Sequence, residues 1–147
     1  MLSRMLYVST ATGPVTTAVT GTILRSAQAH NAVNGITGVL CQGRGVYLQV
    51  LEGERSQVNA LYARIALDKR HHRVVIRQQE DISRRRYGKW AMAHVDMGHM
   101  NVSHPSGAGA THQPAAAFDP YLATAEEVMM KIDALLAAGK VMDAPVI

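Results

Sequence analysis

The order of strand-like and helix-like segments constrains the fold of this chain more than any other feature of its sequence. Residues 5–10 alternate in side-chain character with a period of two, as a β-strand does. From residue 15 to 31 apolar and small residues recur at every fourth position, which is the spacing of one helical face. Strand patterns follow at 35–41 and 46–51, and the glycine-rich residues 42–45 between them predict a tight hairpin turn.

The same succession of patterns continues along the chain. A second amphipathic helix is predicted to end near Asp68, with Ser56 as its predicted N-cap. Two more strands are predicted to begin at Val74 and at Lys89. The resulting order βαββαββ predicts an α+β fold: a ferredoxin-like sheet with both helices on one face, the first and third strands in its centre, and an added fifth strand.

The last third of the chain has a different character. The stretch that follows residue 98 is rich in Ser, Gly, Ala, Pro and His, which predicts an irregular linker. A capping box at Thr124 to Glu127 and a stop at Gly139 then predict a C-terminal amphipathic helix. We therefore divide the chain into a domain of residues 1–98, a linker of residues 99–119, and a C-terminal helix and tail of residues 120–147.

The predicted C-terminal helix carries an apolar stripe that must be covered. The stripe can be buried on the chain's own sheet or on a second copy of the chain, and we expect a homo-oligomer. Its residues are Val128, Met129, Ile132, Leu135 and Leu136.

Charge and cysteine content narrow the class of protein. The net charge is +4, but the basic residues are scattered apart from Arg84–Arg86, so nucleic-acid binding is not expected and that run should be solvated. Cys41 is the single cysteine and is expected to be a buried thiol, which suits a reducing compartment. With no secretion signal and no apolar run near the roughly 20 residues of a membrane span, we expect a cytoplasmic protein without membrane association.

Three polar side chains fall where apolar ones are expected. Gln49 lies in mid-strand, where a buried amide without a partner costs about 1–3 kcal/mol. Tyr7 lies on the neighbouring central strand, on the face opposite to Leu6 and Val8, and Asn31 falls on the same side one helical turn after the preceding face residue. These groups predict either a satisfied polar network in a core or a pocket for a flat ligand with a polar edge. Spacing alone is compatible with both.

Catalytic and metal-binding motifs are not evident in the sequence. His71 and His72 are adjacent and so face opposite ways on a strand, while His99, His104 and His112 lie in the predicted linker without regular ligand spacing. No hydrolase motif is present. The sequence therefore predicts neither an enzyme nor a metal site.

Five short motifs follow one another along the first hundred residues. They read LYVS at 6–9, HNAVNGITG at 30–38, YLQVLEG at 47–53, YARI and DKRH within 62–71, and WAM at 90–92. In this order they resemble the motifs of the BLUF family, sensors of blue light that use FAD. The resemblance covers roughly residues 4–97 and does not extend to the linker or the last helix.

The resemblance implies a role for each matching residue. Tyr7 is the expected electron donor to the excited flavin, and Gln49 the relay whose hydrogen bonds then rearrange. Asn31 is expected to hold the carbonyl edge of the flavin ring, with His30 beside it in the binding site. The positions expected near the ribityl chain and phosphates, where cationic donors are suitable, are Arg64, Asp68, Arg70 and His71. The expected cofactor is FAD, with FMN or riboflavin as possible substitutes.

Two of these assignments have an ordinary structural alternative. Arg64 and Asp68 are four residues apart, which is also the spacing of an exposed helical ion pair. Trp90 and Met92 match a pair that borders the pocket and transmits the signal, and both are predicted to point the same way along the last strand. A core tryptophan with a gap-filling methionine is the alternative.

The sequence as a whole predicts a stand-alone light sensor without an effector domain. Such a sensor must signal to a separate partner protein, through the open face of the sheet or through the terminal helix. The alternative is a ferredoxin-like regulatory or binding module without flavin, in which Tyr7 and Gln49 are structural residues.

Overall fold

The computed structural model describes residues 1–14, 17–97, 118–139 and 141–143, and a six-stranded sheet forms its centre. The strand order is β4-β1-β3-β2-β5-β6. Neighbouring strands are antiparallel except β2 and β5, which are parallel. The strands are β1 (Leu2–Ala11), β2 (Thr37–Gly43), β3 (Val46–Glu54), β4 (His71–Asp81), β5 (Ala93–Asp96) and β6 (Val141–Asp143).

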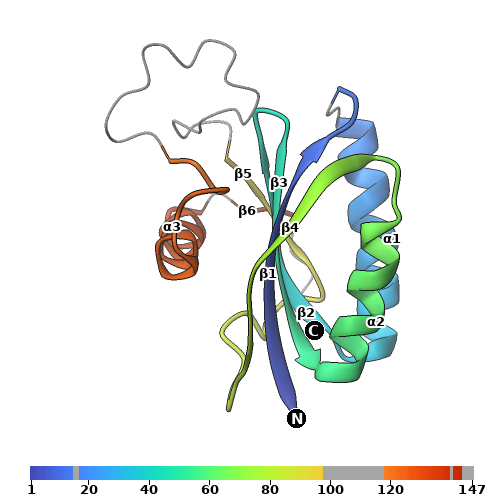
Figure 1. Cartoon of the computed structure of the whole chain (residues 1–147), viewed down its shortest axis with the longest axis vertical. Helices are drawn as coiled ribbons and strands as arrows, with labels where there is room; N and C mark the ends of the chain where they lie inside the picture. Colours follow the sequence, from blue (N-terminus) through green and yellow to red (C-terminus); the bar gives the residue numbers. More distant parts are fainter. Residues whose placement is uncertain (15–16, 98–117, 140, 144–147) are drawn as a thin grey trace.

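Helices cover both faces of this sheet (Figure 1). The helices α1 (Thr17–Asn34) and α2 (Arg55–Ala66) lie on one face, and α3 (Ala125–Ala137) lies on the other. The fold is the predicted ferredoxin-like α+β arrangement, with β1 and β3 side by side in the centre. The edge strand β6 was not predicted, and the predicted linker lies outside the described residues except at Phe118 and Asp119.

Each face of the sheet has its own hydrophobic core because successive side chains of a strand point to opposite sides. Met5 and Tyr7 belong to the cluster beneath α1 and α2. Leu6 and Val8 belong to the cluster beneath α3. The alternation predicted for β1 is therefore confirmed, and β3 follows the same rule.

The boundaries of α1 and α2 differ slightly from the prediction. The helix α1 continues three residues past Asn31 and ends at Asn34, whose Nδ2 donates to the carbonyl of His30 (2.8 Å). The stop is Gly35, which has a φ of 67° that favours glycine. Ser56 is not the N-cap of α2, because that helix already begins at Arg55.

The hairpin between β2 and β3 has the predicted tight turn. Both turn residues, Arg44 (φ 51°) and Gly45 (φ 78°), adopt positive φ, which matches the twist of the flanking strands. Earlier in β2, Gly38 lies so close to β3 that a Cβ there would be 1.9 Å from the carbonyl oxygen of Val50. A glycine is therefore required at position 38 for β2 and β3 to pair.

The helix α3 has the predicted cap and stop. The Thr124 hydroxyl accepts a hydrogen bond from the Glu127 amide (3.1 Å), and Gly139 has a φ of 73°. Val128 and Ile132 are buried against the second face of the sheet. The apolar stripe is thus covered by the chain's own sheet, one of the two outcomes that the sequence left open.

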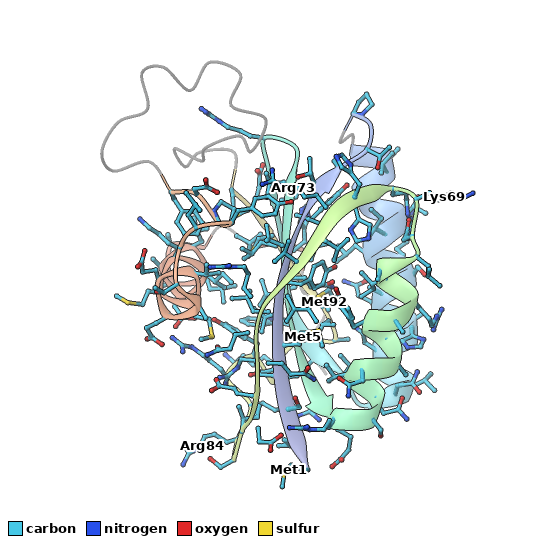
Figure 2. All side chains as sticks on the ribbon, viewed as in Figure 1. Met1, Met5, Lys69, Arg73, Arg84 and Met92 are labelled. Atoms are coloured by element: carbon cyan, nitrogen blue, oxygen red, sulfur yellow. The ribbon has the colours of Figure 1, made fainter. Side chains whose placement is uncertain are left out.

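The segment of residues 82–92, which we call the connecting segment, joins β4 to β5 and is irregular along most of its length. The predicted strand from Lys89 is wrong in its first part, because β5 begins only at Ala93. The Arg84–Arg86 run is not simply solvated either. Arg85 donates to the carbonyl of Gly35 (2.8 Å), and Arg86 binds Asp133 of α3 (2.5 Å). Arg84 is exposed as expected, at the end of the molecule marked in Figure 2, and Arg86 is exposed as well although Asp133 binds it.

A buried carboxylate anchors the connecting segment to β3. Glu52 is fully buried and accepts hydrogen bonds from the amides of Arg86 (3.0 Å) and Tyr87 (2.7 Å). The guanidinium of Arg4 forms an ion pair with the same carboxylate at 2.7 Å. The Tyr87 hydroxyl in turn donates to Asp133 (2.9 Å), so that one strand, one segment and α3 are tied together.

Candidate functional site

A cavity of about 190 Å³ opens between the sheet and the helices α1 and α2. All eight residues predicted for the photoactive and cofactor-binding roles line it. They come from β1, α1, β3, α2, the loop between α2 and β4, and the start of β4, so the fold brings together side chains that are far apart in sequence. These residues are Tyr7, His30, Asn31, Gln49, Arg64, Asp68, Arg70 and His71.

Tyr7 and Gln49 form the polar centre of the cavity floor. The register of β1 and β3 places them directly opposite each other. The Tyr7 hydroxyl donates a short hydrogen bond to Oε1 of Gln49, and both residues are buried. Burial raises the pKa of Tyr7 above its usual value, and the nearby Tyr62 and Asp68 act in the same direction. The phenol is therefore held in its protonated form.

Met92 contacts the other end of the Gln49 amide. Nε2 of Gln49 lies 3.3 Å from Sδ of Met92. A thioether sulfur is a weak acceptor and has no proton to donate. It therefore favours the orientation in which Gln49 turns its nitrogen to Met92 and its oxygen to Tyr7.

Asn31 offers the cavity an acceptor without a partner. Its Nδ2 donates to the carbonyl of Ala91 (2.9 Å), which fixes the orientation of the amide because a carbonyl can only accept. Its Oδ1 is buried and has no hydrogen-bond partner in the described part of the chain. A ligand with an N–H on its edge, such as the imide group of a flavin ring, would satisfy this oxygen. Asn31 therefore fits the cofactor that the sequence predicts.

Charged side chains gather on one side of the cavity. Arg64 donates to Nδ1 of His30 (2.8 Å), and Arg70 forms an ion pair with Asp68 (2.5 Å). The predicted alternative, an ion pair between Arg64 and Asp68, is thus replaced by two other pairs. Two guanidinium groups at the cavity fit the phosphate-bearing part of a dinucleotide.

These pairs shift the titration of both acidic and basic groups. Arg70 lowers the pKa of Asp68 through their hydrogen bonds. Burial lowers the pKa of His30, and the positive charge of Arg64 lowers it further. The two shifts favour a neutral His30 and a charged Asp68 near neutral pH.

His71 joins β1 to the end of α2. Its Nε2 lies 2.6 Å from the carbonyl of Ile65, and its Nδ1 lies 2.7 Å from the hydroxyl of Ser9. Since the carbonyl can only accept, Nε2 must carry a proton, and in the neutral ring Nδ1 then accepts from Ser9. The ring edge also faces Tyr7, with 6.3 Å between the ring centroids.

Trp90 and Met92 do not point the same way, and that prediction is wrong. Met92 is fully buried in the cluster beneath α1 and α2, where its side chain lies between sheet and helices (Figure 2). Trp90 packs against the cluster on the other face. The reason is that residues 91–92 form a bend, so the alternation of an extended strand does not apply to them.

Sequence reasoning assigned no site role to several residues of the cavity wall. On α1 and α2 the signal was present, because Ser26 precedes His30 by four positions and Leu61 precedes Arg64 by three. On the strands, Tyr47 is two residues from Gln49 and therefore shares its face, and Leu40 pairs with Gln49 directly. These wall residues could have been identified from each predicted site residue by adding its neighbours three or four positions away on a helix, and its neighbours two positions away or directly opposite on a strand.

Neither a metal site nor a membrane-spanning helix occurs among the residues that the structure describes. Within the described ranges, no group of three His, Cys, Asp or Glu side chains is arranged to hold a metal ion. Across the same ranges no helix combines the length and the apolar character that a membrane span requires. The histidines at positions 99, 104 and 112 lie outside the residues that the structure describes. Cys41 is buried as predicted, and burial raises the pKa of its thiol.

Comparison with known proteins gives one consistent result. The family model "Sensors of blue-light using FAD" matches residues 2–93. The beta subunit of the photoactivated adenylate cyclase of Euglena gracilis is 35% identical over 92 residues, which are 62% of this chain and 11% of that protein. The chain thus spans about a tenth of the length of this curated relative.

Solved structures agree with the fold. The dark-state structure of BlrB, a BLUF protein, superposes with a TM-score of 0.71 at 24% identity, covering 94% of this chain and 96% of that one. BlrP1 of Klebsiella pneumoniae, solved with FMN and cyclic diGMP, superposes with a TM-score of 0.62 at 28% identity. That match covers 66% of this chain and 26% of the other.

Proposed function

We propose that this chain, which belongs to the BLUF family of blue-light sensors using FAD, is a photoreceptor whose light-responsive pair is Tyr7 and Gln49. The observation that carries the proposal is the hydrogen bond from the Tyr7 hydroxyl to Gln49 Oε1 in the wall of a cavity. BLUF domains are sensor modules and not themselves catalytic. We assign this chain the same sensory role, without turnover of a substrate.

The cavity residues would hold the flavin by two kinds of contact. The unpartnered Oδ1 of Asn31 would accept from the imide N–H of the ring, with His30 beside it. Arg64 and Arg70 would attract the phosphates, with Asp68 and His71 fixing the geometry of that end. FAD is the cofactor of the family, and FMN or riboflavin would make the same ring contacts without the adenosine part.

The light response would begin at Tyr7. When bound, the flavin supplies absorption of blue light and, once excited, an acceptor for one electron. Tyr7 would give that electron, and its phenolic proton would move along the existing hydrogen bond to Gln49. The electron would then return to Tyr7 and the Gln49 amide would give a proton back to the phenolate, so that no net oxidation or net loss of a proton occurs and Gln49 is left rotated or as a tautomer. The changed Gln49 amide would form different hydrogen bonds with the edge of the flavin ring. We therefore expect the absorption spectrum of the flavin to shift to the red.

Two structural features support a route by which the signal passes from the cavity to α3. Met92 contacts the Gln49 amide and belongs to the connecting segment. Arg86 and Tyr87 of the same segment bind Asp133 of α3. We propose that a rearranged Gln49 displaces Met92, with Trp90 following on the other face, and that α3 presents the change to a separate partner protein. The Euglena gracilis relative is a subunit of a photoactivated adenylate cyclase.

The absorption spectrum of the purified chain of 147 residues, before and after blue light, tests the proposal. A yellow protein whose spectrum shifts reversibly to the red is expected. Release of the bound flavin by denaturation and its mass then distinguish FAD from FMN and riboflavin. A protein that stays colourless after incubation with all three flavins and desalting would contradict the proposal, and would favour a ferredoxin-like regulatory module without flavin.

A further inference from the structure

The end of the connecting segment is held by hydrogen bonds to three successive carbonyl groups of its backbone. The carbonyl of Trp90 accepts from the amide of Gly38 (3.1 Å), that of Ala91 from Nδ2 of Asn31 (2.9 Å), and that of Met92 from Nε2 of Gln28 (3.1 Å). Residues 91–92 are outside regular secondary structure. These hydrogen bonds therefore take the place of the ladder that would position a strand.

Gln28 differs from the other two donors. Gly38 donates through its backbone, and Asn31 lines the cavity, whereas Gln28 is not among the residues of the cavity wall. It precedes Asn31 by three positions on α1, so both amides reach the same segment from one side of the helix. The Gln28 side chain is half-buried and about as long as is needed to reach the Met92 carbonyl. Its contact with the light-responsive pair is indirect.

Met92 connects Gln28 with Gln49. The Met92 carbonyl accepts from Gln28, and Sδ of the same residue lies 3.3 Å from Nε2 of Gln49. Because sulfur only accepts, its presence favours one orientation of the Gln49 amide. A residue that holds the Met92 backbone thus influences which atom Gln49 presents to Tyr7.

We propose that Gln28 is a positioning residue of the light response: it holds Met92 against Gln49 and so sets the resting orientation of that amide. This inference rests on the proposed function. It predicts that removal of the Gln28 amide changes the spectrum and the return to the resting state, although Gln28 touches neither Tyr7 nor the cavity. A merely structural role would change stability and leave both optical properties unaltered.

Gln28→Met is the decisive variant, because methionine has a similar length and helix propensity but cannot donate to a carbonyl. Gln57→Met, at an exposed position of α2, is the matched control. Gln28→Lys restores a donor of sufficient reach. In the flavin-loaded chain of 147 residues we expect Gln28→Met to change the rate of dark recovery by about threefold to tenfold, the factor expected for one neutral hydrogen bond. Gln28→Lys should return the rate toward that of the unmodified protein, and Gln57→Met should leave it unchanged.

A second readout does not need the flavin. Trp90 is the only tryptophan of the sequence, so its fluorescence and its quenching by acrylamide report on the connecting segment alone. We expect Gln28→Met to change this quenching, with Gln28→Lys and Gln57→Met close to the unmodified protein. If recovery and resting spectrum are unchanged in Gln28→Met, the positioning role is overturned, whether or not the quenching changes.

Failure of the proposed function gives a different pattern. In that case the unmodified protein itself shows no light response, and the fluorescence of Trp90 remains measurable. Unchanged quenching in Gln28→Met would then overturn the claim that Gln28 holds the segment, while increased quenching would retain that claim without a photochemical role.

Discussion

Tyr7 and Gln49 are direct neighbours across the two central strands, and the Tyr7 hydroxyl donates to Oε1 of Gln49. Neither side chain is more than 5% exposed. The pairing follows from the sheet register, which is fixed over nine consecutive residue pairs from Leu2 to Thr10. The two groups are therefore held in bonding reach before any ligand enters the cavity.

Tyr7→Phe removes the donor of this hydrogen bond and keeps the ring. We expect flavin to remain bound and the reversible red shift to be lost. Phenylalanine has no hydroxyl proton to transfer, and its ring is much harder to oxidise than a phenol. The free energy of unfolding should fall by about 1–3 kcal/mol, since Oε1 of Gln49 loses its partner. Visible spectra and urea denaturation measure the two effects.

Tyr62→Phe is the matched control for this variant. The Tyr62 ring packs edge-on against Tyr7, with 5.9 Å between the centroids, and the substitution preserves that contact. A normal light response in Tyr62→Phe together with a normal response in Tyr7→Phe would remove Tyr7 from the proposed role.

Gln49→Leu removes both halves of the relay while keeping a side chain of similar size. We expect a bound flavin without the reversible red shift, because neither the Tyr7 proton nor the Met92 contact has an amide to act on. Difference spectra before and after illumination provide the measurement. Gln57→Leu, at an exposed position of α2 outside the cavity wall, should respond normally; a red shift of full size in Gln49→Leu would exclude the relay.

His30 should make stability depend on pH. Its pKa is lowered from 6.5 by burial and by Arg64, so the unfolded chain binds this proton more tightly than the folded one. Stability is then expected to fall as the pH drops below about 6.5, through the lowered pKa of the folded state. Urea midpoints between pH 7.5 and 5.0, at constant ionic strength, measure the effect.

In His30→Gln this contribution disappears, and the profile should be flatter over the same range. Arg64→Gln should have an intermediate slope, because the burial contribution remains. Superimposable profiles for the unmodified protein and His30→Gln would contradict the assignment.

Gly38→Ala should disrupt the sheet. The new Cβ would lie 1.9 Å from the backbone oxygen of Val50, so β2 and β3 would have to separate. We expect a loss of about 3 kcal/mol or more, or failure to fold, as judged by thermal unfolding and yield. Gly13→Ala, where no atom lies within 4 Å of the new Cβ, should be close to neutral.

Asp133→Ala should loosen α3 from the connecting segment. The variant removes the acceptor of the Tyr87 hydroxyl and the ion-pair partner of Arg86. We expect a loss of about 1–2 kcal/mol, mainly from the buried Tyr87, since the ion pair is substantially exposed. Urea denaturation measures this loss, and Lys131→Ala on the exposed side of the same helix should be nearly neutral.

Local patterns predicted the parts of the fold that depend on neighbours in sequence. The alternation of β1 placed Tyr7 and Leu6 on opposite faces, and the Thr124 cap identified the start of α3, because both follow from backbone geometry over a few residues. The residue pattern also singled out Tyr7, Asn31 and Gln49 as polar groups, and the family resemblance supplied the other five of the eight predicted site residues, which the fold brings together.

The errors arose where distant residues decide the conformation. Trp90 and Met92 diverge because donors more than fifty residues away hold the intervening carbonyls in a bend. Arg85 and Arg86 were predicted to be solvated because the sequence does not show their partners, among them Gly35 and Asp133, which belong to other parts of the fold. Periodicity carries no information on contacts of this kind.

The separation of the two cores by a single layer of backbone has a consequence for how substitutions combine. Changes beneath α1 and α2 and changes beneath α3 involve different side chains, so their effects on unfolding should sum to within about 0.5 kcal/mol. The connecting segment contributes Met92 to one core and Tyr87 to the other. Coupled, non-additive effects should therefore concentrate in this short stretch, where sensing and output can be adjusted together.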